Sequence, residues 1–473
     1  MQRAFGLVIA TFAFSSLSGG PAVANVQGPI RIRIPHIRVD KGQFDQGRRR
    51  IPVDVTTLLT AARGAPAVVC VLAANSIRNW GWGDWSDAPS TPLSAAKASV
   101  SNGDFDSDPL SQGDLQQLYT GLASDDGCVR ELSVRLIGTQ KPEIVGNELV
   151  SRLGSGDAAL RAIAAFGLGL VEAQNGVDQL IRTLRDGDVD VRANSAWALG
   201  RIENGRSLAP LVALFNDGAE KVRLAAVSAV GHMDDSTSSI PALIRVLRQD
   251  NASSVRRVAA WALGNLEARD GVPALIDALA KDSDGRVREM SAWALGNIED
   301  RRGVAALGAA IRGDTEERVR ETAVWSLGNI GDRSAMDILN AATSDRNANV
   351  RGTAAWAIGN MDDEGAHAPP GLIKLLNDES TDTRLKAAWA LGQLEDVNAL
   401  PAIRDALKAE KNDRVRRALI RALMKSGESS QETLSQLLTS SDPQIREAAV
   451  RGIAGARSFD PWPWPWPRPR PFP

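Results

Sequence analysis

Along most of this chain apolar residues recur every three or four positions among polar ones, a pattern that predicts pairs of short α-helices. In residues 271–280, GVPALIDALA, apolar side chains recur three or four residues apart and so share one helix face. The next five residues, KDSDG, favour a turn. Residues 287–298, VREMSAWALGNI, predict a second helix whose small residues permit close stacking. The stripe expected to face the first helix consists of Val287, Ser291, Ala294 and Ile298, with Leu295 beside it.

This helix pair recurs along the chain, because an arginine marks each second helix at intervals of 30 to 33 residues. An apolar residue precedes the arginine in every unit except one, where Thr383 takes its place. A repeat of this length predicts an α-solenoid, in which stacked units share one core. We therefore expect an all-α fold of about eleven helix pairs. The arginines are Arg130, Arg161, Arg192, Arg223, Arg256, Arg288, Arg320, Arg351, Arg384, Arg416 and Arg446.

Length and charge agree with this prediction. A chain of 473 residues exceeds the usual size of one globular core, whereas a solenoid grows by adding units. The formal net charge of -2 provides no strong field that would attract nucleic acid. Solenoids bind other molecules more often than they catalyse reactions, so the predicted architecture favours a binding protein over an enzyme.

The first 24 residues resemble an export signal. Arg3 provides a basic end, AFGLVIATFAF an apolar stretch, and Ala22-Val23-Ala24 a small-residue cleavage site. No later stretch is long and apolar enough to span a bilayer, and no cysteine follows the cleavage site to carry a lipid. We expect a periplasmic or secreted protein that does not insert into the membrane.

Export changes the interpretation of the two cysteines, Cys70 and Cys128. An oxidising compartment favours a disulfide between them. The bridge would tie an N-terminal helical cap, residues 57–79, to the first repeat. Two buried free thiols are the alternative.

The remaining segments differ in composition. Residues 25–56 form a basic leader, either an extended anion-binding arm or a solvated tether, and residues 80–113 form an acidic linker rich in Gly, Ser and Pro. Within the linker, DFDSD at residues 104–108 suggests Ca²⁺. However, Pro109 and Leu115 stand where a calcium loop needs glycine and glutamate, so we expect no metal site.

Seven repeats carry an aspartate six residues before the arginine, and this pattern resembles the HEAT repeat of the short bacterial, phycobilisome-lyase-like type. The resemblance covers residues 114–456 and implies an armadillo-like superhelix. It also implies that these aspartates and the following arginines form a ladder that ties successive units together. The units of Arg130, Arg161, Arg416 and Arg446 lack the aspartate. The seven are Asp186, Asp217, Asp250, Asp282, Asp314, Asp345 and Asp378.

Tryptophan recurs five residues after the arginine in six repeats, and an amide usually follows four residues later. Helical geometry places both at the flank of the core stripe, where we expect partial burial. The resemblance implies a concave groove lined by second helices, and indole with amide groups suits an extended peptide. Alternatively, the rings pack between repeats. The tryptophans are Trp197, Trp261, Trp293, Trp325, Trp356 and Trp389; the amides are Asn265, Asn297, Asn329 and Asn360, with Arg201 and Gln393 at the outer positions.

The tail, residues 457–473, ends in FDPWPWPWPRPRPFP, in which alternating proline favours an extended conformation. Trp462, Trp464, Trp466 and the two following arginines make it a candidate ligand for a partner or for the chain's own groove. A disordered end without fixed contacts is the alternative.

Catalytic motifs are missing from the sequence. The three histidines, His36, His232 and His367, have no neighbouring acid, and neither zinc spacing nor a phosphate loop occurs. We expect no cofactor and a non-enzymatic scaffold or adaptor that binds a protein or peptide through the concave Trp/Asn surface. A lyase-like enzyme of the same superfamily and a partner of a membrane sensor peptidase are the alternatives.

Overall fold

The computed structural model describes residues 54–76, 110–233, 237–361, 367–441 and 443–453. These residues form helices α1 to α24 with short 3-10 turns and contain no strand. The helices are α1 Val55–Ala62, α2 Ala67–Ser76, α3 Gln112–Leu122, α4 Gly127–Ile137, α5 Pro142–Arg152, α6 Ala158–Leu170, α7 Val177–Thr183, α8 Val189–Ile202, α9 Leu208–Ala213, α10 Glu220–His232, α11 Ile240–Gln249, α12 Ser253–Asn265, α13 Val272–Lys281, α14 Gly285–Ile298, α15 Val304–Gly313, α16 Glu317–Ile330, α17 Met336–Ala342, α18 Ala348–Asn360, α19 Pro370–Lys374, α20 Thr381–Leu394, α21 Leu400–Ala409, α22 Asp413–Lys425, α23 Gln431–Leu438 and α24 Pro443–Ile453.

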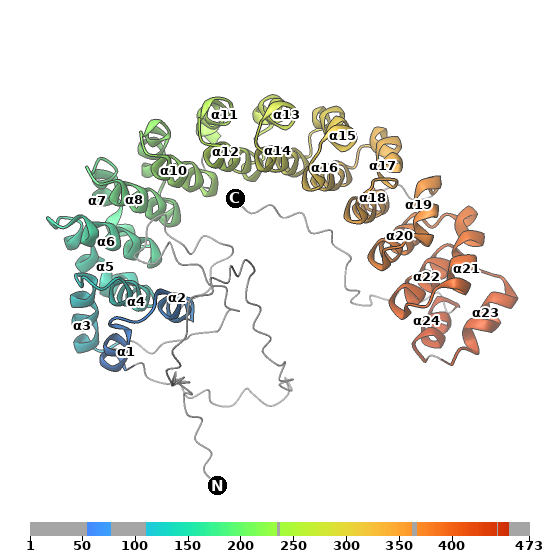
Figure 1. The fold of residues 1–473 in the computed structure, drawn as a ribbon, viewed down its shortest axis with the longest axis horizontal. Coiled ribbons are helices and arrows are strands. Elements are labelled where there is room, and N and C mark those ends of the chain that lie inside the picture. The colour runs from blue at the N-terminus through green and yellow to red at the C-terminus, as the bar shows by residue number, and fades with distance from the viewer. Residues whose placement is uncertain (1–53, 77–109, 234–236, 362–366, 442, 454–473) are drawn as a thin grey trace, which may run out of the picture. The chain divides into compact units, whose positions relative to one another are not determined.

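Helices α3 to α24 form eleven pairs that pack in series, so the expected all-α solenoid is confirmed. In each pair the odd-numbered first helix lies against the even-numbered second helix, and successive pairs stack side by side (Figure 1). Neighbouring second helices contact each other far more extensively than neighbouring first helices do. We therefore call the second helices the inner row.

The ends of the second helices follow from local sequence. Helix α8 begins where Asp188 accepts hydrogen bonds from the backbone amides of Asp190 and Val191, and Asn347 begins α18 in the same way. Several second helices end at a left-handed residue, for example Glu299 with φ 53° and Gly331 with φ 64°. These caps keep the second helices at 11 to 14 residues, close to the lengths that the periodic pattern predicts.

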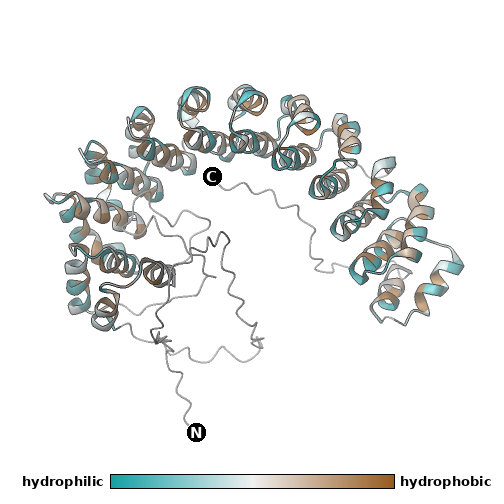
Figure 2. Ribbon diagram, in the orientation of Figure 1, coloured by the Kyte–Doolittle hydropathy of each residue, from teal (hydrophilic) through white to brown (hydrophobic). Residues whose placement is uncertain are grey.

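The two rows bury different fractions of their surface. First helices such as α11 bury one stripe, Leu243, Val246 and Leu247, beside hydrophilic residues (Figure 2). Second helices such as α18 bury every residue from Gly352 to Gly359, because they touch the first helix and both neighbouring second helices. Alanine and glycine permit this close approach, as the sequence pattern predicts.

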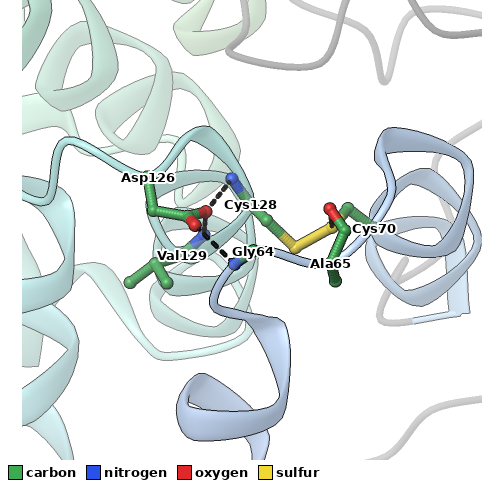
Figure 3. The surroundings of a disulfide bond; sticks show 6 residues. All are labelled: Gly64, Ala65, Cys70, Asp126, Cys128 and Val129. Atoms are coloured by element: carbon green, nitrogen blue, oxygen red, sulfur yellow. Dashed lines mark hydrogen bonds between the residues drawn. A yellow bond between two sulfur atoms is a disulfide. The ribbon is translucent and has the colours of Figure 1, made fainter.

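Helices α1 and α2 precede the first repeat and are joined to it by the predicted Cys70–Cys128 disulfide, which is confirmed (Figure 3). Asp126 caps α4 through the amides of Cys128 and Val129 and also accepts a hydrogen bond from the Gly64 amide at 2.8 Å. These hydrogen bonds, with that from Gly64 the largest cause, lower the pKa of the Asp126 carboxyl. One carboxylate and one disulfide therefore fasten the N-terminal helices onto α4.

Several predicted boundaries shift slightly in the structure. Helix α1 begins at Val55, two residues before the predicted cap of residues 57–79, and α3 begins at Gln112, inside the predicted linker of residues 80–113. The predicted signal, DFDSD, and the tail of residues 457–473 lie outside the described residues, as does the leader up to residue 53.

Candidate binding face on the second helices

The repeated arginines form the expected ladder between successive units. Arg256 donates from Nε and Nη2 to Asp282 at 2.7 and 2.9 Å, and from Nη1 to the backbone carbonyl of Asp250 at 2.9 Å. Each arginine thus binds the carboxylate of the following repeat and the turn carbonyl of its own. The pairs are Arg161–Asp186, Arg192–Asp217, Arg223–Asp250, Arg256–Asp282, Arg288–Asp314, Arg320–Asp345, Arg351–Asp378 and Arg384–Glu410.

Sequence reasoning missed the last of these acids, Glu410. It stands six residues before Arg416, so a search for any carboxylate at that position finds it. The ladder also affects titration: hydrogen bonds from Arg384 lower the pKa of the Glu410 carboxyl, and those from Arg161 lower that of Asp186. These bidentate pairs are structural. We call the repeated arginine of each second helix, including Arg130 on α4 and Arg416 on α22, its ladder arginine.

Five of the six tryptophans, all except Trp325, pack against a glycine of the preceding repeat. A Cβ placed on Gly264 would lie 2.8 Å from Cζ3 of Trp293, and one on Gly359 would lie 2.8 Å from Cζ3 of Trp389. Three rings are buried, with Trp197 4%, Trp261 8% and Trp356 3% exposed, so the expectation of partial burial is wrong for these. The glycine eight residues after the ladder arginine has no side chain, so the indole of the following repeat fits between the two second helices. Trp293, Trp325 and Trp389 are partly buried.

The side-chain amides nine residues after the ladder arginine also link neighbouring second helices through hydrogen bonds. Asn265, Asn297 and Asn360 donate from Nδ2 to the carbonyl oxygen of the glycine in the preceding repeat, at 2.9, 3.0 and 3.1 Å. Arg201 donates from Nε to the Gly169 carbonyl in the same way, at 3.1 Å. Asn329 stands at this position on α16 and is half-buried. The Trp and Asn ladders therefore both serve repeat stacking, whatever else they bind.

Charged residues that sequence reasoning missed lie one position after the ladder arginine. Arg257, Glu289 and Glu321 occupy this position on α12, α14 and α16, where α6 and α8 have alanine. All three side chains are half-buried. Burial raises the pKa of both glutamates and lowers that of the Arg257 guanidinium, and Arg257 Nε is buried without a hydrogen-bond partner. The signal that could have marked them is the run of three consecutive charged residues at a position where the flanking repeats have Leu224 and Gly352.

These positions define one face of the inner row. We consider four positions on each second helix: two residues before the ladder arginine, and one, five and nine residues after it. Successive positions are three or four residues apart, so all four lie on one side of the helix. We call this side the inner face. On α14 it carries Arg286, Glu289, Trp293 and Asn297. Cys128 occupies the first of these positions on α4, so the disulfide places α2 against the inner face there.

Two of the three histidines lie within the described residues. His232 is mostly buried against the Trp261 ring, with centroids 4.3 Å apart, and burial lowers its pKa to about 2. His367 is exposed, but its Nδ1 lies 3.5 Å from a carboxylate oxygen of Asp396. No acid is adjacent to His367 in the sequence, but folding brings Asp396 close to it from the next repeat. His36 lies outside the described residues.

Helix α22 carries a distinct inner face. The four positions are occupied by Arg414, Arg417, Arg421 and Lys425, all basic. Arg421 stands where six other repeats have tryptophan. A Cβ on Gly392, the matching glycine of α20, would meet only Ala422 atoms as its nearest neighbours, at 3.2 to 3.7 Å.

A family model and several solved structures are similar to this chain. A sequence model of HEAT repeats matches residues 146–231, 240–325, 304–369 and 369–454. A structure of Kap95p with RanGDP has a TM-score of 0.51 at 14% identity, and the match covers 72% of this chain and 55% of that one. An engineered protein has a TM-score of 0.41 at 20% identity, with 73% and 99% covered. The CpcE–CpcF complex of phycocyanin lyase from Nostoc sp. PCC7120 has 0.32 at 22% identity, with 54% and 95% covered.

No curated protein sequence matches the chain. Among the described helices, none is sufficiently long and apolar to cross a membrane.

Proposed function

Because the chain belongs to the HEAT-repeat family, we propose that it is an exported, non-enzymatic scaffold whose inner face binds an extended peptide or a protein partner. HEAT-repeat solenoids are typical of protein-interaction scaffolds. Kap95p, which shares the fold, is bound to the protein RanGDP in its structure, and this supports a protein ligand here.

One observation carries the proposal: the half-buried charges Arg257, Glu289 and Glu321 occupy the inner face in three consecutive repeats. Burial disfavours their charged forms, so at neutral pH each glutamate lowers the stability of the folded chain. A residue that weakens folding but sits on an accessible face suits binding, because charged groups of a partner can compensate it.

The partly exposed rings Trp293 and Trp325 flank the two glutamates and add contact area. Trp293 packs on Gly264 of the preceding repeat, both rings are partly buried against the core, and both occupy inner-face positions beside the charges. Partly exposed indoles next to desolvated charges resemble the centres of protein interfaces. The Asn ladder contributes the amide oxygens, since its nitrogens are used for stacking.

A capture experiment tests this face. The mature chain and the variant Arg257→Gln/Glu289→Gln/Glu321→Gln are used to retrieve partners from an envelope extract, which are identified by mass spectrometry and then titrated calorimetrically. We expect the triple variant to lose the partner by at least about tenfold in affinity, the equivalent of 1.4 kcal/mol.

The matched control is Asp337→Asn/Asp405→Asn/Lys408→Gln, which alters three exposed charges on the first helices α17 and α21. It should bind as the parent does. A partner that binds parent, triple variant and control equally would place the interface elsewhere and overturn the proposal.

Export requires its own test. N-terminal sequencing of the chain recovered from the periplasm or medium should begin at Asn25 if residues 1–24 are cleaved. A chain that stays in the cytoplasm with Met1 intact would contradict this part of the proposal.

A further inference from the structure

The inner face of α22 interrupts the aromatic stack of the preceding repeats. Trp356 packs on Gly328 and Trp389 packs on Gly359, but Arg421 follows Gly392. Trp389 is therefore the last indole of the stack among the described repeats. Beyond it, the inner face presents guanidinium groups.

The four basic residues of α22 form one continuous strip. Arg414, Arg417, Arg421 and Lys425 are spaced three, four and four residues apart, so they lie along one side of a helix about 20 Å long. Arg414 and Lys425 are exposed, and the two central arginines are half-buried. A guanidinium that donates hydrogen bonds in its own plane still offers its flat faces for stacking on an aromatic ring.

The fold already stacks arginine on aromatic rings between neighbouring helices. The Arg135 guanidinium lies 4.9 Å from the centroid of Phe166, and that of Arg152 lies 4.7 Å from the centroid of Tyr119. Such a contact is attractive because the face of an aromatic ring carries partial negative charge, and the attraction grows as the contact is desolvated. An aromatic ligand for the α22 strip would thus use chemistry that this chain uses elsewhere.

The chain carries a matching aromatic segment within reach. Trp462, Trp464 and Trp466 follow the end of α24 at Ile453 by nine to thirteen residues and alternate with proline. At about 3.1 Å per residue, an extended segment of this length reaches roughly 28–40 Å. Packed helices lie about 8–10 Å apart, so the segment can cross from α24 and extend along the whole of α22.

We propose that residues Trp462–Trp466 dock in cis on the inner face of α22, with their indoles stacked on Arg417 and Arg421. The docked segment continues the aromatic stack past Trp389 and covers the C-terminal end of the inner face. The surface on α12 to α16 stays open, so this inference goes beyond the proposed function and does not depend on it. Loss of tail docking would leave the capture experiment on α12 to α16 unaffected.

Fluorine NMR of the complete chain labelled with 5-fluorotryptophan tests the docking directly. The chain has twelve tryptophans, and substitution of Trp462, Trp464 or Trp466 by Phe assigns the three tail signals. A docked tail tumbles with the 50.4 kDa protein, so its signals should be broad and shifted from the random-coil position. Arg417→Gln/Arg421→Gln should release the tail and give three narrow signals at that position.

Two further variants control for folding and for general charge effects. Arg414→Gln/Lys425→Gln changes only exposed residues of α22 and should also narrow the tail signals, in part. Arg286→Gln/Arg318→Gln removes two exposed inner-face arginines from α14 and α16 and should leave them broad. Narrow coil-like tail signals in the parent, narrowing by the α14/α16 control, or narrowing upon dilution, which indicates docking on a second copy, would each overturn the proposal.

Discussion

The close approach of second helices at glycine can be tested at Gly264, the point where α12 meets α14. A Cβ at this position would lie 2.8 Å from Cα and Cβ of Ala294 and 2.8 Å from Cζ3 of Trp293. Ordinary contact begins at 3.4 Å, so α14 would have to retreat by about 0.6 Å, the difference between 3.4 and 2.8. Because one of the contacted atoms belongs to the backbone, a side-chain rotation cannot relieve the contact.

We expect Gly264→Ala to lower the free energy of unfolding by about 1–2 kcal/mol. Overpacking of this kind costs about 1–3 kcal/mol, and a displacement of this size weakens neighbouring dispersion contacts. The backbone contact with Ala294 places the overpacking cost in the upper part of this range, at about 2–3 kcal/mol, and the better helix propensity of alanine offsets about 1 kcal/mol of it. The retreat would also stretch the hydrogen bond from Asn297 to the Gly264 carbonyl, now 3.0 Å.

The matched control is Gly313→Ala at the end of α15, where an added Cβ meets nothing within 4 Å. Here only helix propensity changes, so stability should rise by up to about 1 kcal/mol. Urea unfolding followed by circular dichroism measures both variants, and amide hydrogen exchange should show faster exchange in α12 and α14 for Gly264→Ala alone. Equal stability of the two variants would refute the packing argument.

Three further perturbations test the ladder and the N-terminal cap. Arg256→Gln leaves a buried carboxylate unpaired and should cost about 2–3 kcal/mol in urea unfolding, whereas Arg301→Gln, at a side chain 84% exposed, should change stability by less than about 0.5 kcal/mol. Hydrogen bonds from the ladder arginine hold the pKa of Asp186 below its ordinary value of 3.8. Its contribution is therefore complete above about pH 4 and lost as pH falls further, and urea midpoints between pH 5 and pH 2 should fall less in Asp186→Asn than in the parent. Cys70→Ser/Cys128→Ser removes a cross-link between residues 58 apart, worth about 4 kcal/mol in chain entropy, and should accelerate hydrogen exchange in α1, α2 and α4 while the later repeats stay protected.

The fold could be predicted from the sequence because every structural element repeats. The period, the arginine and the turn aspartate recur, and each has one local role, so helix pairs, their number and the ladder follow from counting. Burial of Trp197 and Trp356 could not be predicted in this way. Their burial depends on the glycine of the preceding repeat and on the distance between two neighbouring second helices. Helical geometry within one repeat gives no information about either.

The candidate site was missed for a related reason. Residues that recur in every repeat stabilise the stack, as the Trp and Asn ladders do through Gly264 and its equivalents. Glu289 and Glu321 occupy a position that α6, α8, α10, α18 and α20 fill with alanine, leucine or glycine, and their burial makes the folded chain less stable at neutral pH. Glu289→Gln should therefore raise stability at pH 7, because it removes a charge that burial disfavours, while binding through the inner face declines. A change that improves folding and impairs binding separates the two kinds of residue, since substitution of a ladder residue impairs folding first.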